Sequence, residues 1–573
     1  MRRSLAGASV TTALIATALV TPAAPVGAAP ASTSTGQSTQ YVVLYERGVS
    51  DAAGRQAVEA AGGTVVSSNT KVGYAIASSS AADFALRAAG SSELVGAAHN
   101  RKVGQAPHAQ RSDRAAVERA EQERKADKGK ASSSKKAVKA EPLSDLQWDM
   151  KQIGATAKGS YAEQRGSKKV LVGIIDTGID GDHPDIKPNF DAKLSRNFTT
   201  DMVDIDGPCE YAGCKDPANV DDNEHGTHVA STIGSPINGL GIAGVAPNVT
   251  LVNIRAGQDS GYFFLQPTLD ALTYAGDIGV DVVNMSYYTD PWLYNCLSNP
   301  ADSPAEQAEQ RTVREATQRA LDYARNKGVL PVAAAGNGAT DLGKPTFDGS
   351  SPDYPVDPDG NPTQARDRNV DNSCITVPTE SKGVVAVTAT GISKRKAYYS
   401  DYGIEQADVA APGGDVYDTA DNRRSAAAGI LAAYPKHLAE QNGDLNPDGT
   451  PNTPFVVQDC TSKGVCGYYQ YLQGTSMAAP HAVGVAALIV SEFGEKDSKH
   501  KGGLTLSPKK TEKVLLRSAT ERACPSGGSY TYTRLVPSGA TVTTTHVCEG
   551  SKDRNGFYGS GIVNALRAVQ DDD

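Results

Sequence analysis

The sequence predicts an α/β protein in which a mostly parallel sheet is flanked by helices and preceded by a small α/β domain. From residue 142 onward, continuous apolar strands alternate with helical segments, a pattern typical of a parallel sheet covered on both faces. A separate run of strand and helix patterns occupies residues 41–100. With 573 residues, 39% of them hydrophobic and 21% charged, the chain has the composition of a folded globular protein.

Residues 1–28 have the pattern of an export signal. Two arginines precede an apolar stretch from about Leu5 to Val20, and small residues around Ala28 form a cleavage pattern. The prolines and small residues after the apolar stretch disfavour the alternative, an N-terminal membrane anchor. Since no later apolar run reaches about 18 residues, we expect a secreted, extracellular protein with no membrane span in its mature form.

Residues 29–104 are predicted to form the small domain, and residues 105–141 a charged linker. Strand patterns cover residues 41–45, 64–66 and 73–77, and helix patterns cover residues 52–61 and 81–89. Residues 101–141 contain almost no large apolar side chains, so they cannot build a core of their own.

Charge is distributed unevenly along the chain. The net charge is −9, but residues 101–141 carry +6 and residues 142–573 carry −16. Because an acidic body of this size repels phosphate backbones, the sequence argues against nucleic acid as a partner.

Residues 142–573 are predicted to form the large domain. Its apolar strands are expected at residues 170–175, 249–254, 280–285, 329–334 and 383–387, with helices at 266–276 and 309–326. In such sheets, functional sites form at the carboxyl ends of the strands.

All eight cysteines lie in this domain, and an even number in an exported chain indicates disulfides. A zinc site is the alternative, but no pair has C-x2-C spacing and no nearby histidine completes a ligand set. We predict local pairing for three pairs and assign the fourth by elimination: Cys209 with Cys214, Cys460 with Cys466, Cys524 with Cys548, and Cys296 with Cys374.

Three polar residues stand where catalytic groups are expected. Asp176 follows the strand at 170–175, His225 opens a helical segment, and Ser476 precedes a long apolar helix. A serine hydroxyl needs a base to take its proton as it attacks, and a carboxylate can hold that base in the right tautomer. Each residue alone would more often be a cap or a satisfied polar group, so the combination with its flanking residues carries the prediction.

The order Asp, His, Ser separates this arrangement from other triads, because α/β-hydrolases run Ser, Asp, His and the chymotrypsin type runs His, Asp, Ser. A zinc site at His225 and His228 is disfavoured, since the H-E-x-x-H spacing and its glutamate are absent.

Segments 175–180, 225–230 and 474–480 resemble the three signatures of subtilisin-like serine proteases, and segment 334–337 resembles that family's oxyanion segment. The resemblance runs from about residue 147 to residue 568. Residues 41–100 resemble, more weakly, the family's inhibitory and chaperone propeptide. The resemblance therefore implies a subtilisin-like fold and peptide-bond hydrolysis through an acyl-enzyme, with no cofactor for catalysis.

The resemblance also implies roles for individual residues. Ser476 would be the nucleophile, His225 the general base and acid, and Asp176 the orienting carboxylate. Asn337 would donate its side-chain amide to the oxyanion, together with the backbone N–H of Ser476. Peptide or protein substrate would bind as an added strand in a cleft, lined by Ser260, Gly261, Ser286 and Gly336.

Some positions depart from the family pattern. Tyr288 stands where the family usually has glycine, so we expect reshaped subsites on the acyl side of the cleft. The stretches 289–310, 338–375, 415–470 and 523–550 are longer than the minimal pattern. His481, within the serine motif, is expected to be structural.

A calcium site is also implied by resemblance. The loop at 236–242 is similar to a family loop that wraps Ca²⁺, and Asp185 and Asn238 would supply hard oxygen ligands. The alternative is an ordinary turn rich in Gly and Asn.

The small domain is expected to act as an intramolecular inhibitor of a monomeric enzyme until it is cut away. In that role, residues 97–100 would lie in the cleft as a product-like strand. Two functions compete with the protease: a binding protein on an inactive protease scaffold, which the intact triad disfavours, and a lipase or esterase, which the triad order and the missing G-x-S-x-G motif disfavour.

Overall fold

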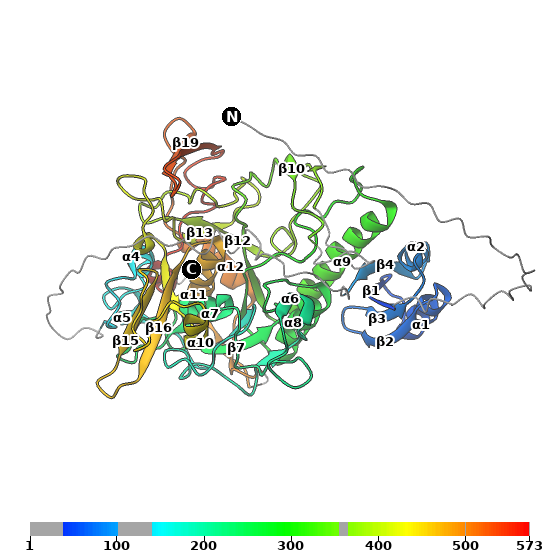
Figure 1. Ribbon diagram of the computed structural model, residues 1–573, viewed down its shortest axis with the longest axis horizontal. Coiled ribbons are helices and arrows are strands. Elements are labelled where there is room, and N and C mark those ends of the chain that lie inside the picture. Colours follow the sequence, from blue (N-terminus) through cyan, green and yellow to red (C-terminus); the bar gives the residue numbers. More distant parts are fainter. Residues whose placement is uncertain (1–37, 101–139, 354–364, 499, 572–573) are drawn as a thin grey trace, which may run out of the picture. The chain divides into compact units, whose positions relative to one another are not determined.

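The computed structural model describes residues 38–100, 140–353, 365–498 and 500–571 (Figure 1). The export signal predicted at 1–28 and nearly all of the predicted linker lie outside these residues. Residues 38–571 belong to one compact unit.

The large domain is built on seven parallel strands in the order β13-β12-β9-β8-β5-β7-β6. The central strands are buried along their whole length, which explains their continuous apolar sequence. In chain order the strands are β5 (Leu171–Ile175), β6 (Arg196–Asn197), β7 (Thr250–Arg255), β8 (Val282–Met285), β9 (Leu330–Ala334), β12 (Val385–Thr390) and β13 (Val409–Pro412).

Helices cover both faces of this sheet. One face packs against α7 (His225–Gly234), α11 (Thr475–Phe493), α12 (Pro508–Ser518) and α13 (Ala565–Gln570). The other packs against α8 (Leu265–Ile278) and α9 (Pro304–Asn326). Helix α9 begins five residues before the predicted start at 309, because Ser303 and Glu306 form a capping box and Pro304 occupies the first turn. The predicted α/β fold with a mostly parallel sheet is confirmed.

The small domain is a four-stranded antiparallel sheet in the order β2-β3-β1-β4 with two helices. Its elements are β1 (Thr39–Tyr45), α1 (Asp51–Ala60), β2 (Thr64–Asn69), β3 (Tyr74–Ser79), α2 (Phe84–Ala89) and β4 (Leu94–His99). The apolar run in β1 is continuous because both sheet faces are covered. Tyr41 and Val43 pack toward the domain's own helices, whereas Val42 and Leu44 join the core that contains α8 and α9.

Two segments differ from the prediction. Residues 97–99, expected in the substrate cleft, belong to β4, where they pair with β1 and contact α9. The side chains of this strand face two cores: Leu94 and Ala97 pack inside the small domain, whereas Val95 and Ala98 pack against the core that contains α8 and α9. Glu141, placed at the end of the linker, is 4% exposed and accepts the backbone N–H of Gly239 at 2.7 Å, so it packs with the large domain.

Four disulfides join the predicted pairs, and the prediction for the cysteines is confirmed. Cys460–Cys466 closes the tip of an antiparallel hairpin, β15 (Val456–Cys460) and β16 (Cys466–Leu472), and Cys524–Cys548 flanks another, β19 (Ser529–Leu535) and β20 (Thr541–Val547).

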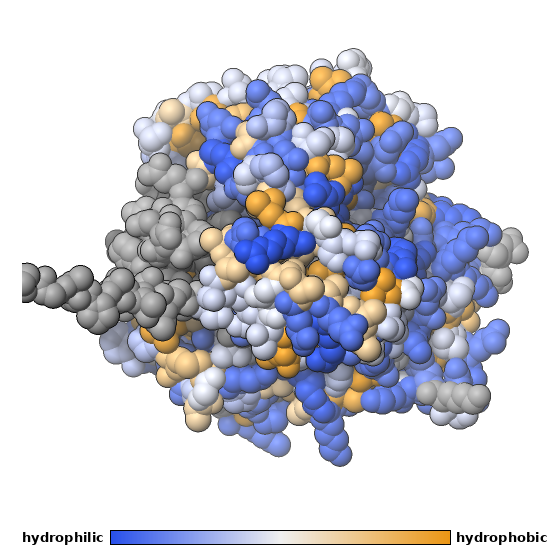
Figure 2. Space-filling view, turned by 90° about the vertical axis from the view of Figure 1, so that its right-hand side faces the viewer, coloured by the Kyte–Doolittle hydropathy of each residue, from blue (hydrophilic) through white to orange (hydrophobic). Residues whose placement is uncertain are grey.

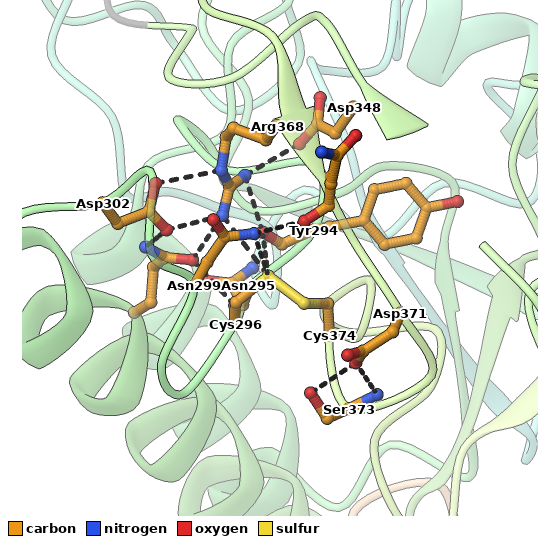
Figure 3. The surroundings of a disulfide bond; sticks show 12 residues. Tyr294, Asn295, Cys296, Asn299, Asp302, Asp348, Arg368, Asp371, Ser373 and Cys374 are labelled. Atoms are coloured by element: carbon orange, nitrogen blue, oxygen red, sulfur yellow. Dashed lines mark hydrogen bonds and ion pairs between the residues drawn. A yellow bond between two sulfur atoms is a disulfide. The ribbon is translucent and has the colours of Figure 1, made fainter. Parts of the chain in front are cut away.

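The two long stretches 289–310 and 338–375 together form one insertion, joined by Cys296–Cys374 and by a buried arginine (Figure 3). Arg368, 0% exposed, donates to both carboxylate oxygens of Asp302 at 3.0 and 2.8 Å and to Asp348 at 2.8 Å. Its guanidinium also stacks 4.8 Å from the ring centroid of Trp292. The insertion therefore has a polar core of its own.

Within the described residues, α11 is the one helix long and apolar enough to cross a membrane, and 83% of its apolar window is buried inside the protein. It contacts strands β8, β9, β12 and β13 as a central core helix. On the face drawn in Figure 2, hydrophilic side chains predominate and apolar ones form small scattered groups.

Candidate active site

The predicted site residues follow the carboxyl ends of neighbouring parallel strands. Asp176 follows β5, Gly261 lies just beyond β7, Ser286 follows β8, and Asn337 lies just beyond β9. Since the strands run parallel, their carboxyl ends lie at one edge of the sheet. Ser476 reaches the same edge, because its carbonyl oxygen accepts the hydroxyl of Ser286 at 3.0 Å.

Asp176 and His225 form a buried pair. His225 Nδ1 lies 2.7 Å from Asp176 Oδ1, and the backbone N–H of Thr177 donates to the same oxygen at 2.8 Å. Asp176 is fully buried, whereas the side chain of His225 is 13% exposed. Burial raises the pKa of Asp176, and the neighbouring His225 opposes that rise. The carboxylate therefore fixes the imidazole so that Nε2 is the ring nitrogen left for proton transfer.

Asp221 is a positioning residue that the sequence analysis missed. Its Oδ1 accepts the hydroxyl of Thr177 at 3.0 Å, and its Oδ2 accepts both the backbone N–H and the hydroxyl of Thr227, at 2.9 and 2.5 Å. One fully buried carboxylate thus ties the strand end that carries Asp176 to the first turn of the helix that carries His225. Its only sequence signal is an aspartate four residues before the histidine, at a helix N-terminus.

Ser476 lies in the first turn of α11, where one backbone hydrogen bond of the helix is replaced. Pro480 has no N–H, so the carbonyl of Ser476, four residues earlier, loses its intrahelical donor. The hydroxyl of Ser286 supplies the missing hydrogen bond at 3.0 Å. Ser476 Oγ itself lies 3.4 Å from the carbonyl oxygen of Ser286. Ser286, predicted to line the cleft, therefore also anchors the nucleophile's helix.

The side-chain carbonyl of Asn337, the expected oxyanion donor, is fixed by the residue before Ser476. Its Oδ1 accepts the backbone N–H and the hydroxyl of Thr475, each at 2.9 Å. Because a backbone N–H must meet the carbonyl end, these contacts settle which end of the amide is which. Among the described residues Nδ2 has no hydrogen-bond partner, so it is the group that can donate to substrate.

Two tyrosines next to the expected substrate-binding segments contact one carboxylate. Tyr262 follows Ser260 and Gly261, and its hydroxyl lies 3.2 Å from Asp353 Oδ1. Tyr288 follows Ser286, and its hydroxyl lies 3.4 Å from Oδ2 of the same carboxylate. Asp353 belongs to the insertion, so the insertion contacts both segments that are expected to bind substrate.

Asp185 and Asn238 lie together, but their contacts do not fit calcium. Asn238 Nδ2 donates to Asp185 Oδ1 at 3.0 Å. The backbone N–H of Ile242 and the hydroxyl of Tyr469 donate to Oδ2, at 3.0 and 3.1 Å. Calcium needs oxygen lone pairs that converge on it, whereas N–H and O–H donors occupy those of Asp185. The expected calcium loop is instead closed by hydrogen bonds.

A second acidic cluster surrounds Arg255. This guanidinium is fully buried and lies 2.5 Å from Asp216, 2.6 Å from Asp259 and 3.6 Å from Asp201. The carboxylates of Asp201, Asp259 and Glu210 have oxygens within 4.8 Å of one another. The side chain of Asp201 is 1% exposed, and neither of its oxygens has a hydrogen-bond partner within the described part of the chain. Burial raises the pKa of Asp201 to about 7 and that of Asp259 to about 8.

Two other histidines are structural. His228 Nε2 lies 3.1 Å from the carbonyl of Ile430. His481 lies 2.8 Å from the carbonyl of Met477 and 3.0 Å from Asp149, and it is fully buried. Neither contact involves the catalytic pair.

Comparison with known proteins agrees with this geometry. The model of the subtilase family matches residues 167–558. The thermophilic serine proteinase of Bacillus sp. (strain AK1) is 29% identical over 329 residues, which cover 57% of this chain and 54% of that protein. Subtilisin DY of Bacillus licheniformis is 29% identical over 338 residues, 59% of this chain and 82% of that protein.

Two solved structures share the fold. The epidermin leader peptide processing serine protease of Staphylococcus aureus has a TM-score of 0.56 at 20% identity, over 93% of this chain and 98% of that chain. Fervidolysin from Fervidobacterium pennivorans, described as a keratinolytic enzyme related to subtilisin, has a TM-score of 0.53 at 20% identity, over 93% of this chain and 61% of that chain.

Proposed function

The chain belongs to the subtilase family of serine proteases, and from this premise we propose that it is a secreted, monomeric serine endopeptidase made as an inactive precursor. The observation that carries the proposal is the buried Asp176–His225 pair, at 2.7 Å, together with Ser476, which contacts Ser286 at the same edge of the sheet from the first turn of a core helix. The four disulfides support an extracellular location, because such bonds persist in oxidising compartments.

The geometry supports a triad mechanism. His225 takes the proton of Ser476 as the hydroxyl attacks the peptide carbonyl, and Asp176 stabilises the imidazolium that forms. Asn337 Nδ2 and the backbone N–H of Ser476 donate to the oxyanion. His225 then returns the proton to the leaving amine, and a water molecule hydrolyses the acyl-enzyme by the same route.

Substitution Ser476→Ala tests the proposal. Peptide hydrolysis should fall by about 10⁶ in kcat, a size taken from subtilisin, a member of the same family, rather than derived. The variant should also lose labelling by a fluorophosphonate probe while keeping the wild-type melting temperature. Unchanged turnover would refute the assignment.

The small domain supports the proposed inhibition. It contacts α8 and α9 through apolar residues of β1 and β3 and through hydrogen bonds such as Arg319 to the carbonyl of Tyr45, at 2.7 Å. Its last described residues reach further along the large domain: His99 lies 2.9 Å from Glu309, and Asn100 donates to Gln266 at 2.6 Å. These contacts attach the end of the small domain to α9 and α8 of the large domain, as an intramolecular inhibitor requires.

The proposal includes a structural calcium ion, assigned to Asp201, Glu210 and Asp259 rather than to Asp185. The support is geometric: three carboxylates converge, and the buried oxygens of Asp201 lack hydrogen-bond donors. Calcium titration by calorimetry should show a site that Asp201→Asn weakens at least about tenfold and that the control Asp185→Asn leaves intact. The reverse result would return the site to the 236–242 loop, and no binding by the wild type would remove calcium from the proposal.

A further inference from the structure

Asp401, a buried carboxylate with no role in the proposed mechanism, lies against the turn that carries Asn337. We propose that Asp401 is a positioning residue for oxyanion stabilisation: it fixes the turn at residues 336–340 and thereby the aim of the Asn337 amide. The inference rests on the proposed function, because it concerns how well the oxyanion is stabilised. Asp401 itself would touch no substrate.

Asp401 hydrogen-bonds to both ends of the turn, to one end through its carboxylate and to the other through its backbone. The backbone N–H of Thr340 donates to Asp401 Oδ1 at 2.7 Å, and the backbone N–H of Asp401 donates to the carbonyl of Gly336 at 2.8 Å. Asp401 is 5% exposed, so these bonds do not compete with bulk water. A carboxyl oxygen accepts the N–H of Thr340 whether the group is ionised or carries a proton on its other oxygen, so this one side chain fixes the turn in either state.

The residues on either side of Asn337 are shaped to receive the carboxylate. Gly336 has φ +118°, and a Cβ atom there would collide with Asp401 Oδ2. A Cβ atom on Gly338 would lie 3.2 Å from Asp401 Oδ1. The carboxylate therefore packs directly against the backbone before and after Asn337, and only glycine leaves room for it at position 336.

The turn depends on these contacts because it has left the sheet. Its last sheet hydrogen bond runs from Ala335 to Val387, at 2.9 Å. Beyond that point Thr475 hydrogen-bonds to the side-chain carbonyl of Asn337. Residues 399–402 hydrogen-bond to the backbone of the turn. The backbone carbonyl of Tyr399 accepts the N–H of Ala339 at 2.7 Å, and the backbone N–H of Tyr402 donates to the carbonyl of Thr340 at 2.9 Å. Within residues 399–402, Asp401 is the residue that hydrogen-bonds to the turn through its side chain.

The backbone just before Asp401 is held by a buried lysine. Lys396 Nζ donates to the carbonyls of Ala397 and Ser400, at 3.0 and 2.6 Å. These bonds fix the backbone turn that leads into Asp401. The hydroxyl of Tyr532, in β19, donates to the carbonyl of Lys396 at 2.8 Å. Burial raises the pKa of Asp401 to about 7, and Lys396 and the N–H donors oppose that rise.

The test is a double-mutant cycle between residues 401 and 337. Asp401→Leu removes the acceptors at similar size, and Asp401→Asn keeps one acceptor oxygen. Since an error of about 1 Å in a catalytic geometry can lower the rate about 10²-fold, we expect Asp401→Leu to lower kcat about 10- to 100-fold, with KM within about twofold, and Asp401→Asn to lose less. In the Asn337→Leu background, Asp401→Leu should lower kcat less than about threefold, because the amide donor that Asp401 positions is absent.

Asp281→Asn is the matched control. Asp281 is a buried carboxylate that also accepts a backbone N–H, from Leu171 at 2.8 Å, but it precedes β8 at the opposite end of the strand from Ser286. This variant should keep kcat and KM within about twofold of the wild type. Melting temperatures of all variants separate loss of fold from loss of rate, and if Asp401→Leu does not fold, the cycle is run with Asp401→Asn.

Three results would overturn the inference: an equal loss of kcat in both backgrounds, a change in KM alone, or the same loss in Asp281→Asn. In each of these cases the wild type still hydrolyses peptide and Ser476→Ala does not, so the proposed function stands. A wild-type enzyme that hydrolyses no peptide would overturn the proposed function and this inference together.

Discussion

At the scale of single residues, the two ends of the Asn337 amide have separate tasks. Its carbonyl end is fixed by Thr475, and its N–H end is left for substrate. Substitution Asn337→Leu removes the donor and no proton-transfer group. We expect kcat to fall by about 10²–10³ with little change in KM, a size known from subtilisin rather than derived for this chain. Steady-state kinetics on a peptide substrate checks this, and a loss confined to KM would mean that Asn337 binds the ground state.

Tyr288 gives a prediction on selectivity. Its hydroxyl and that of Tyr262 approach the same carboxylate, Asp353, and we infer that the two rings restrict the groove expected on the acyl side. Tyr288→Gly should widen that groove and raise kcat/KM about tenfold for peptides with large side chains there, while small ones change little. Cleavage profiles of a peptide library with both enzymes, and with Tyr262→Phe as a control that keeps the ring, measure the shift. Identical profiles would show that Tyr288 lies outside the subsites.

Sequence reasoning found Asp176, His225 and Ser476 because each stands in a specific motif, and the structure brings Asp176 and His225 into contact. Asp221 and Asp401 were missed because an aspartate in a loop has no local signal of its role. What identifies them is the donors that converge on their carboxylates from segments far away in the chain, and only the fold brings those donors together.

At the scale of elements, Asp221 links β5 to α7. Asp221→Asn replaces one oxygen with an NH₂ group that cannot accept the backbone N–H or the hydroxyl of Thr227. Leaving such buried donors unsatisfied costs about 1–3 kcal/mol each, so the free energy of unfolding should fall by that order. We also expect lower kcat, because His225 is two residues before Thr227 on the same turn. Denaturant unfolding together with kinetics checks both effects, and wild-type stability would contradict the linking role.

The insertion formed by residues 289–310 and 338–375 gives a second prediction at this scale (Figure 3). Arg368→Met removes a buried cation and leaves Asp302 and Asp348 facing each other without it. Breaking a buried ion pair from one side costs about 3–5 kcal/mol. The melting temperature should therefore fall, and the exposed pair Arg423–Asp421 offers a control, since Arg423→Met should change stability little. Equal melting temperatures for both variants would show that the insertion does not depend on its polar core.

Most elements of the large domain were predictable because parallel strands buried on both faces have continuous apolar sequences. Errors gathered where polar or small residues decide the structure. Strand β4 contains Gly96 and small alanines and was not predicted, and the first turn of α9 is specified by a capping box rather than by apolar spacing. The calcium site at 236–242 stays a prediction made from resemblance, which could not show that donors fill the lone pairs of Asp185.

At the scale of the whole molecule, two domains share one core. The sheet of the small domain is apolar on both faces, and one of these faces packs with α8 and α9. A domain of this size gains much of its stability from such contact, and a large parallel sheet with many long-range pairings folds slowly. The small domain is therefore suited both to template the folding of the large one and to remain bound to it afterwards.

The last prediction concerns that interface. The hydroxyl of Tyr74 donates to Asp270 on α8, whereas the hydroxyl of Tyr45 donates to Asp51 within the small domain, at 3.4 Å. A hydrogen bond to a charged group contributes about 1.5–3 kcal/mol, which corresponds to about 10- to 100-fold in affinity. Segment 29–104 added to matured enzyme should therefore inhibit peptide hydrolysis, with an inhibition constant raised about 10- to 100-fold by Tyr74→Phe and little changed by Tyr45→Phe. Equal effects of the two variants would place the hydroxyl of Tyr74 outside the inhibitory contact, and no inhibition by the wild-type segment would make the small domain a spacer.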